Sequence, residues 1–241
     1  VWRVDLSNST KAGVKENGVN FANRVVRILN MSGSNAPRFY ATPTFTIHNS
    51  NNGIFAAITI GSGNLSYPMS ASSNQNDAVY VLFDKDVTRR NLAVLKDTEL
   101  YTKDLAIGAS GNTVIKNTDG NTSVTMANGG WYYPVGNKKR ILNDHIAIDN
   151  DLYVSIFDAS KDIDDVSCAG GVRGESNVSQ FCLPFGQCTK LNNQGQYEKS
   201  NRPEDIFLGK GNIGISFGGL DRKRGLVLNL PTDKPLKTYT G

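Results

Sequence analysis

The chain has 241 residues, a hydrophobic fraction of 39% and a charged fraction of 20%, which exclude wholesale disorder. No apolar run approaches the roughly 18 residues that a membrane-spanning helix needs. The net charge of +4 is small and dispersed along the chain, so it gives no indication of nucleic-acid binding. The length suits one large all-β domain.

Short segments with alternating apolar and polar residues predict β-strands, because alternation puts one face of a strand in a core and the other in water. Their residues are β-branched or aromatic, as strands prefer. In chain order these segments are residues 44–48, 55–60, 78–83, 145–149, 152–157, 213–217 and 226–230. The best candidate helix is residues 87–96, preceded by the possible capping residues Asp84 and Asp86.

Three segments each predict a hairpin of two strands joined by a turn rich in Asn, Asp or Gly. They are residues 44–61, 144–157 and 212–230, with turns at residues 49–53, 149–151 and 221–225. Hairpins that recur with long insertions between them favour a β-propeller, and a β-sandwich is the alternative. We predict loop insertions at residues 97–128 and 162–203. In the second of these, residues 168–203 have few periodic apolar positions.

The three cysteines, Cys168, Cys182 and Cys188, lie within one short segment. Their spacing and the distant histidines do not suit zinc. Clustered cysteines instead favour a local disulfide in an exported protein. We expect Cys168 to pair with Cys182 or with Cys188, which leaves one odd thiol.

No motif for a catalytic nucleophile, a metalloprotease or a phosphate-binding loop is present. The one pair of residues that suits a catalytic role is Asp144 next to His145. The acidic cluster at Asp158, Asp162, Asp164 and Asp165 lacks the alternate spacing and central Gly of a calcium loop, so we interpret it as a solvated loop. Lys138, Lys139 and Arg140 are interpreted as charges at a hairpin tip.

Several pieces of sequence together form a recognisable pattern. Residues 58–69 (ITIGSGNLSYPM) are followed by the strand-like residues 78–86 (AVYVLFDKD). Three further pieces occur, namely residues 1–6 (VWRVDL), residues 130–144 with GWYYP and RILND, and residues 182–188 (CLPFGQC). In content and order they resemble the PilY/PilC family of type IV pilus-associated proteins.

The resemblance implies a modified β-propeller, of which this chain is the C-terminal part, about the last four blades. The family's upstream blades, calcium loop and N-terminal adhesive region then lie outside the chain, so calcium is implied only upstream and no metal ligand is assigned here. It also implies a bacterial protein at the cell surface, at the pilus tip, secreted or associated with the outer membrane. The implied partners are minor pilins of the tip complex and a host-cell or abiotic surface.

We therefore expect a non-enzymatic pilus-tip adhesin and biogenesis factor that acts in the control of pilus extension and retraction. The candidate binding residues are aromatic residues in the long insertions, Tyr101, Phe181, Phe185 and Tyr197. Trp2 and Trp131 are expected to be buried. The alternatives are a propeller enzyme, such as a quinoprotein-like dehydrogenase or a glycosidase, and a carbohydrate-binding propeller.

Overall fold

The computed structural model describes residues 1–5, 24–29, 31, 36–50, 53–70, 77–85, 87, 115–116, 129–161, 172–186, 188–191, 194–200, 204–220, 223–228 and 237–239. All regular structure in these residues is β-strand, so the predicted all-β class is confirmed. These residues include no helix suited to crossing a membrane. The candidate helix at residues 87–96 lies, apart from Val87, outside the described residues.

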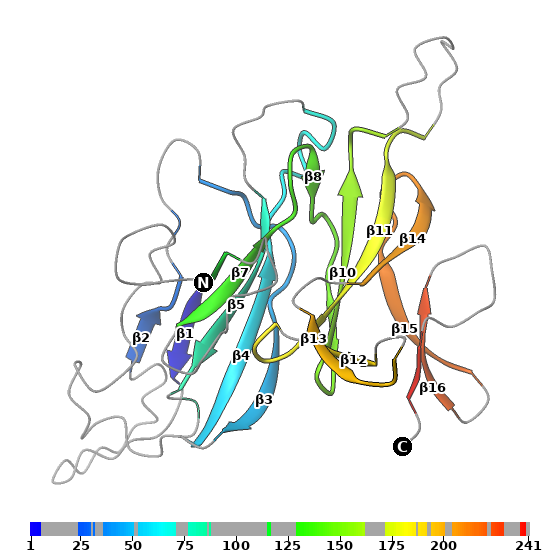
Figure 1. Ribbon diagram of the computed structural model, residues 1–241. Coiled ribbons are helices and arrows are strands. Elements are labelled where there is room, and N and C mark those ends of the chain that lie inside the picture. Colours follow the sequence, from blue (N-terminus) through cyan, green and yellow to red (C-terminus); the bar gives the residue numbers. More distant parts are fainter. Residues whose placement is uncertain are drawn as a thin grey trace, which may run out of the picture.

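Four stacked sheets and one separate hairpin contain the 17 described strands (Figure 1). Sheet I pairs β1 (Trp2–Asp5) with β2 (Arg24–Arg27). Sheet II has the order β3 (Thr44–Ser50), β4 (Gly53–Gly61), β5 (Ala78–Asp84), β7 (Gly130–Pro134) and β6 (Ile115–Lys116).

Sheet III has the order β14 (Glu204–Lys210), β11 (Glu175–Cys182), β10 (Asp151–Asp158) and β8 (Lys139–Arg140), and β9 (Ile146–Ile148) also pairs with β10. Sheet IV consists of β15 (Ile215–Leu220), β16 (Lys223–Leu228) and β17 (Lys237–Tyr239). The separate hairpin is β12 (Cys188–Leu191) with β13 (Tyr197–Ser200). Apart from the parallel pair β6–β7, the described pairs are antiparallel, and none of these sheets closes on itself.

The sheets stack face to face in chain order, with a separate apolar layer at each contact. Between sheets I and II lie Ile28, Leu29, Ile60, Tyr80 and Leu82. Between sheets II and III lie Phe55, Val81, Phe83, Trp131, Leu152, Val154 and Phe181. Between sheets III and IV lie Tyr153, Val178, Leu208, Ile213 and Ile215. Sheets II and III therefore each pack against an apolar layer on both faces, which is why all seven residues of β5 are buried.

The three predicted hairpins are confirmed as β3–β4, β9–β10 and β15–β16. The third turn is shorter than expected, because Leu220 pairs with Lys223.

The prediction that residues 168–203 form a loop is wrong, since they contain β11, a central strand of sheet III. Its alternation is hidden because Ser176 and Ser179 occupy buried positions. The Ser176 hydroxyl donates to the Gly211 carbonyl at 2.6 Å and accepts from the Ile213 amide at 3.0 Å.

The two tryptophans differ in burial. Trp131 is 2% exposed, as predicted, and packs between sheets II and III. Trp2 is 62% exposed, so the prediction of its burial is wrong. Sheet I reaches sheet II through Val1 and the residues after β2. Trp2 follows Val1 in an extended segment, so its side chain lies on the opposite, outer face.

A tight backbone junction joins sheets II and III where residues 61–63 (Gly-Ser-Gly) meet Ile141. The Ile141 amide donates to the Ser62 carbonyl at 3.0 Å. A Cβ atom on Gly63 would lie 2.4 Å from the Ile141 carbonyl oxygen, and one on Gly61 would lie 2.4 Å from the Ile141 Cγ2. Both positions therefore require glycine because there is no space for a side chain.

Buried polar groups surround this junction. Arg140 is 2% exposed, so its interpretation as a charge at a hairpin tip is wrong. Its guanidinium donates to the carbonyls of Pro68 and Ser70, and its Nε lies 3.9 Å from Asp77 Oδ2. The Ser62 hydroxyl donates to Asp77 Oδ1 at 3.0 Å. Burial raises the pKa of the Asp77 carboxyl, and the Ser62 hydrogen bond and the Arg140 charge act in the opposite direction.

We predict that Gly63→Ala destabilises the protein by about 3 kcal/mol or more, because the clash involves backbone that has little room to move. The matched control is Gly214→Ala, whose Cβ would meet Asn143 at an ordinary 3.4 Å. The control should change stability by less than about 1 kcal/mol. Urea unfolding of both variants checks this, and equal effects of the two substitutions would refute the junction.

Candidate functional site

The four predicted binding residues have different positions. Phe181 is 2% exposed and Phe185 is partly buried, and both belong to the layer between sheets II and III. The Phe185 ring centroid lies 5.8 Å from that of Phe83. The expectation that Phe181 is an exposed anchor is therefore wrong. Tyr197 is the first residue of β13, and Tyr101 lies outside the described residues.

A disulfide joins Cys182 to Cys188, with their Cα atoms 5.0 Å apart. The expected pairing with Cys168 is therefore wrong, and Cys168 itself lies outside the described residues. Sequence spacing allowed each of the three pairings. The deciding factor is the chain direction after β11, where a tight turn brings the Gly186 amide to the Cys182 carbonyl at 2.8 Å.

The disulfide loop, residues 182–188, is fixed to the body at several points. The Leu183 amide donates to the Asn150 carbonyl at 2.7 Å. The Trp131 Nε1–H donates to the Pro184 carbonyl at 2.6 Å. Gly186 has a φ of +73°, and a Cβ there would lie 3.3 Å from the Trp131 indole. The loop therefore forms a fixed lid over the apolar layer between sheets II and III.

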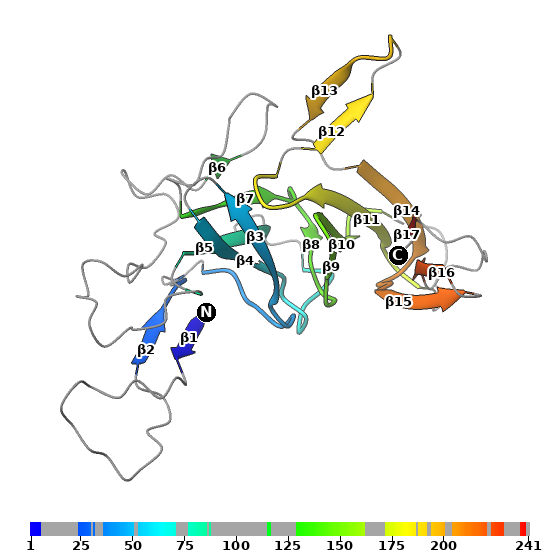
Figure 2. The same cartoon turned by 90° about the horizontal axis from the view of Figure 1, so that it is seen from below.

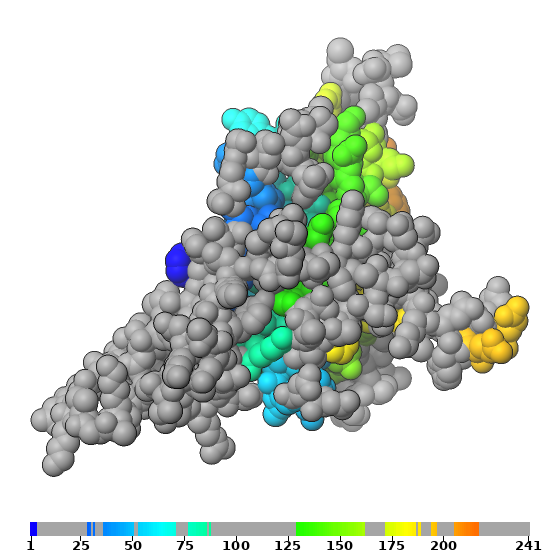
Figure 3. Space-filling view, turned by 60° about the vertical axis from the view of Figure 1, so that its left-hand side comes forward, coloured from blue at the N-terminus to red at the C-terminus, as the bar shows by residue number. Residues whose placement is uncertain are grey.

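The hairpin β12–β13 starts at this fixed lid and projects away from the stacked sheets (Figures 2 and 3). Its strands pair from Cys188 with Ser200 to Leu191 with Tyr197. Gln194, Gly195 and Gln196 near its tip are exposed. A projecting element on a rigid base suits the binding of a macromolecular partner, because little conformational entropy is lost on association. This projecting hairpin is the candidate functional site.

The two histidines are packing residues. The His145 Nε2 lies 3.0 Å from the Thr59 carbonyl, so Nε2 carries the proton that it donates. Burial lowers the pKa of His145, although the bond to Thr59 and the Asp144 charge raise it. Burial also lowers the pKa of His48. The carboxylate of Asp144 accepts from the Thr42 amide at 2.7 Å, so this pair holds backbone in place.

Asp158 is the only member of the predicted acidic cluster among the described residues. Its Oδ1 accepts from the Ser160 amide at 2.9 Å and from the Ser160 hydroxyl. Within the described ranges, no three His, Cys, Asp or Glu side chains come together as a possible metal site. Calcium binding upstream of this chain stays a prediction.

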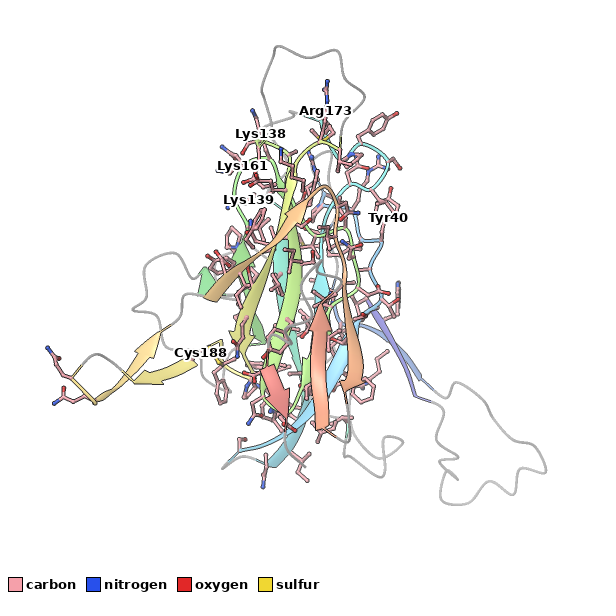
Figure 4. The ribbon with its side chains drawn as sticks, turned by 90° about the vertical axis from the view of Figure 1, so that its right-hand side faces the viewer. Tyr40, Lys138, Lys139, Lys161, Arg173 and Cys188 are labelled. Atoms are coloured by element: carbon pink, nitrogen blue, oxygen red, sulfur yellow. A yellow bond between two sulfur atoms is a disulfide. The ribbon has the colours of Figure 1, made fainter. Side chains whose placement is uncertain are left out.

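Basic residues gather at the end of sheet III that is remote from the projecting hairpin (Figure 4). Lys138, Lys161 and Arg173 are exposed, and Lys139 Nζ lies 3.9 Å from Asp158 Oδ2. They come from three adjacent turns, because the Ala159 amide donates to the Lys138 carbonyl and Glu175 pairs with Asp158. Sequence reasoning did not identify this group, since its members are distant along the chain.

No family model, curated protein or solved structure matches this chain. The assignment of a function therefore starts from the sequence of this chain and from its structure.

We predict that peptide mapping without reduction recovers one bridge, Cys182–Cys188. Replacing both cysteines by Ser should lower stability by about 2 kcal/mol, the expected effect of opening a short covalent loop. Cys168→Ser, as the control, should leave the bridge intact. A peptide that links Cys168 to either partner would contradict the structure.

Proposed function

We propose that this chain belongs to a non-enzymatic type IV pilus-tip adhesin and biogenesis factor, and that the projecting hairpin contacts minor pilins. The chain would be the C-terminal part of a modified β-propeller at the bacterial cell surface, secreted or associated with the outer membrane. The observation that carries the proposal is the convergence in space of the sequence pieces that resemble the PilY/PilC family.

The glycines of residues 61–63 are in contact with Ile141, which lies in a second piece 78 residues further on. Trp131, from the GWYYP piece, donates to Pro184 in the CLPFGQC piece. Residues of three separate pieces therefore contact one another at two places, and both places belong to the apolar layer between sheets II and III. A family whose members share these contacts would retain these three pieces in the same order, which is the pattern that the sequence carries.

The stacking of the sheets supports a propeller. Successive antiparallel sheets in chain order pack face to face, as propeller blades do. One strand from each of sheets II, III and IV lies near the next, since β3 is close to β9 and β9 is close to β15. In a propeller the innermost strands of neighbouring blades meet in this way around a central axis. Sheets II and III each have five strands, whereas a standard blade has four, so the proposed propeller is a modified one.

The described residues support a binding role for the projecting hairpin better than they support a catalytic role. The lid that carries the hairpin is fixed by a disulfide and by hydrogen bonds from Trp131 and Leu183. Asp144 and His145 were the candidates for a catalytic pair in the sequence. Both side chains hydrogen-bond to backbone groups, Asp144 to the Thr42 amide and His145 to the Thr59 carbonyl. We therefore assign binding to the hairpin and no catalytic role to the described residues.

The test uses the full protein that carries this chain, produced in a piliated bacterium. In one variant, a short Gly-Ser linker replaces residues 189–199, which removes the hairpin but keeps Cys188. We expect normal export and an unchanged melting temperature, with recovery of minor pilins from the sheared surface fraction reduced at least about tenfold. The control substitutes Asn51 and Asn52, which follow β3 in the sequence and are far from the hairpin along the chain, by Ser.

Two outcomes would overturn the proposal in different ways. If neither the parent protein nor the variants recover minor pilins, the pilus assignment is wrong. If the hairpin variant recovers them as well as the parent does, the assignment of the contact to the hairpin is wrong.

A further inference from the structure

One part of sheet III's inner face is left uncovered by sheet II. Leu152, Val154 and Phe181 on this face lie in the layer between the two sheets. Farther across the same face, Asn177 of β11 pairs with Phe207 of β14. Cross-strand partners share a face and lie about 5 Å apart at Cβ. Phe207 is 55% exposed, so an aromatic ring faces solvent next to Asn177.

A polar recess opens on the same face, and its lining includes Asn177, the cross-strand partner of Phe207, and Asp205, which lies two residues before Phe207 on β14. Its walls and floor are formed by Tyr133, Lys139, Ile156, Asp158, Asn177 and Asp205. These residues come from β7, β8, β10, β11 and β14, so the recess stands on strands of two packed sheets and not on mobile loops. Sites on rigid strands hold their groups in a fixed geometry.

The carboxylates of the recess are held in place by neighbouring hydroxyls. The Ser179 hydroxyl, 2% exposed as a residue, donates to Asp205 Oδ1. The Ser160 hydroxyl donates to Asp158 Oδ1, and Lys139 Nζ lies 3.9 Å from Asp158 Oδ2. Asn177 adds an amide that both donates and accepts. Orienting these groups before a ligand arrives reduces the entropy cost of binding.

We propose that this recess is a binding subsite for a neutral pyranose of a surface glycan. The apolar face of the sugar ring would stack on Phe207, and adjacent hydroxyls would donate to Asp205 and accept from Asn177 and Lys139. An apolar surface with a few convergent polar groups is the usual form of a small-molecule site. Two carboxylates and one ammonium line the recess, so the lining itself favours a neutral sugar over a uronate or phosphate, while the exposed Lys138, Lys161 and Arg173 at the same end of sheet III (Figure 4) act in the opposite direction.

This subsite goes beyond the proposed pilus function and does not depend on it, since it uses no residue of the projecting hairpin. It also differs from the aromatic residues that the sequence indicated. Phe207 was missed because it stands in a run of three consecutive apolar residues that was not among the predicted strands, and its exposure depends on the position of β14 at the edge of sheet III.

The test titrates this protein with methyl α-D-mannopyranoside, methyl β-D-galactopyranoside, N-acetyl-D-glucosamine and D-glucuronate, using saturation-transfer NMR and calorimetry. We expect at least one neutral sugar to bind and glucuronate to bind more weakly. Phe207→Ala and Asp205→Asn should each weaken binding about tenfold or more. Asp205→Asn keeps an acceptor for Ser179, so the fold is retained in at least this variant.

The matched control is Phe45→Ala, because Phe45 is a similarly exposed phenylalanine, 70% accessible, on sheet II. It should bind sugar as the parent protein does. Absence of binding by every neutral probe would overturn the proposal. Parent-like binding by both Phe207→Ala and Asp205→Asn would also overturn it, as would equal or tighter binding of glucuronate.

Discussion

The backbone contact between residues 61–63 and Ile141 is the constraint on which the arrangement of sheets II and III depends. A side chain at Gly61 or Gly63 would fill the space that Ile141 occupies, so glycine at these two positions is what allows this close approach. The contact brings Arg140 over the carbonyls of Pro68 and Ser70 and close to Asp77, and these groups are removed from water together. Buried polar groups without partners are costly, so this junction favours one arrangement of the sheets over others.

The junction also determines what the protein can present to other molecules. Trp131 and Phe181 fill the layer beside it, and the disulfide loop covers that layer from outside. The projecting hairpin starts from this loop, so its base is as rigid as the core beneath it. The recess with Phe207 arises for a related reason, because sheet III extends beyond the part that sheet II covers. Both proposed binding features are therefore consequences of how two sheets meet.

Alternation predicted strands well where apolar residues mark the buried positions, as in the hairpins β3–β4 and β9–β10. It failed for β11, where the polar residues Ser176 and Ser179 occupy buried positions. Their hydroxyls donate to the Gly211 carbonyl and to Asp205 Oδ1, which allows their burial. Alternation also could not predict which aromatic residues are buried. Phe181 and Phe207 lie on the same face of sheet III, but only Phe181 is covered by sheet II. The junction glycines were visible in the sequence, whereas their partner Ile141 became evident only from the packing.

The most direct test of the junction is a double-mutant cycle on Arg140 and Asp77, measured by urea unfolding. Arg140→Met alone should cost about 3–5 kcal/mol, because it leaves the Asp77 carboxylate buried without its charged neighbour. Adding Asp77→Asn should restore part of that loss, with a coupling energy of at least about 1 kcal/mol. Single-substitution effects that add without coupling would contradict a junction built on these two groups.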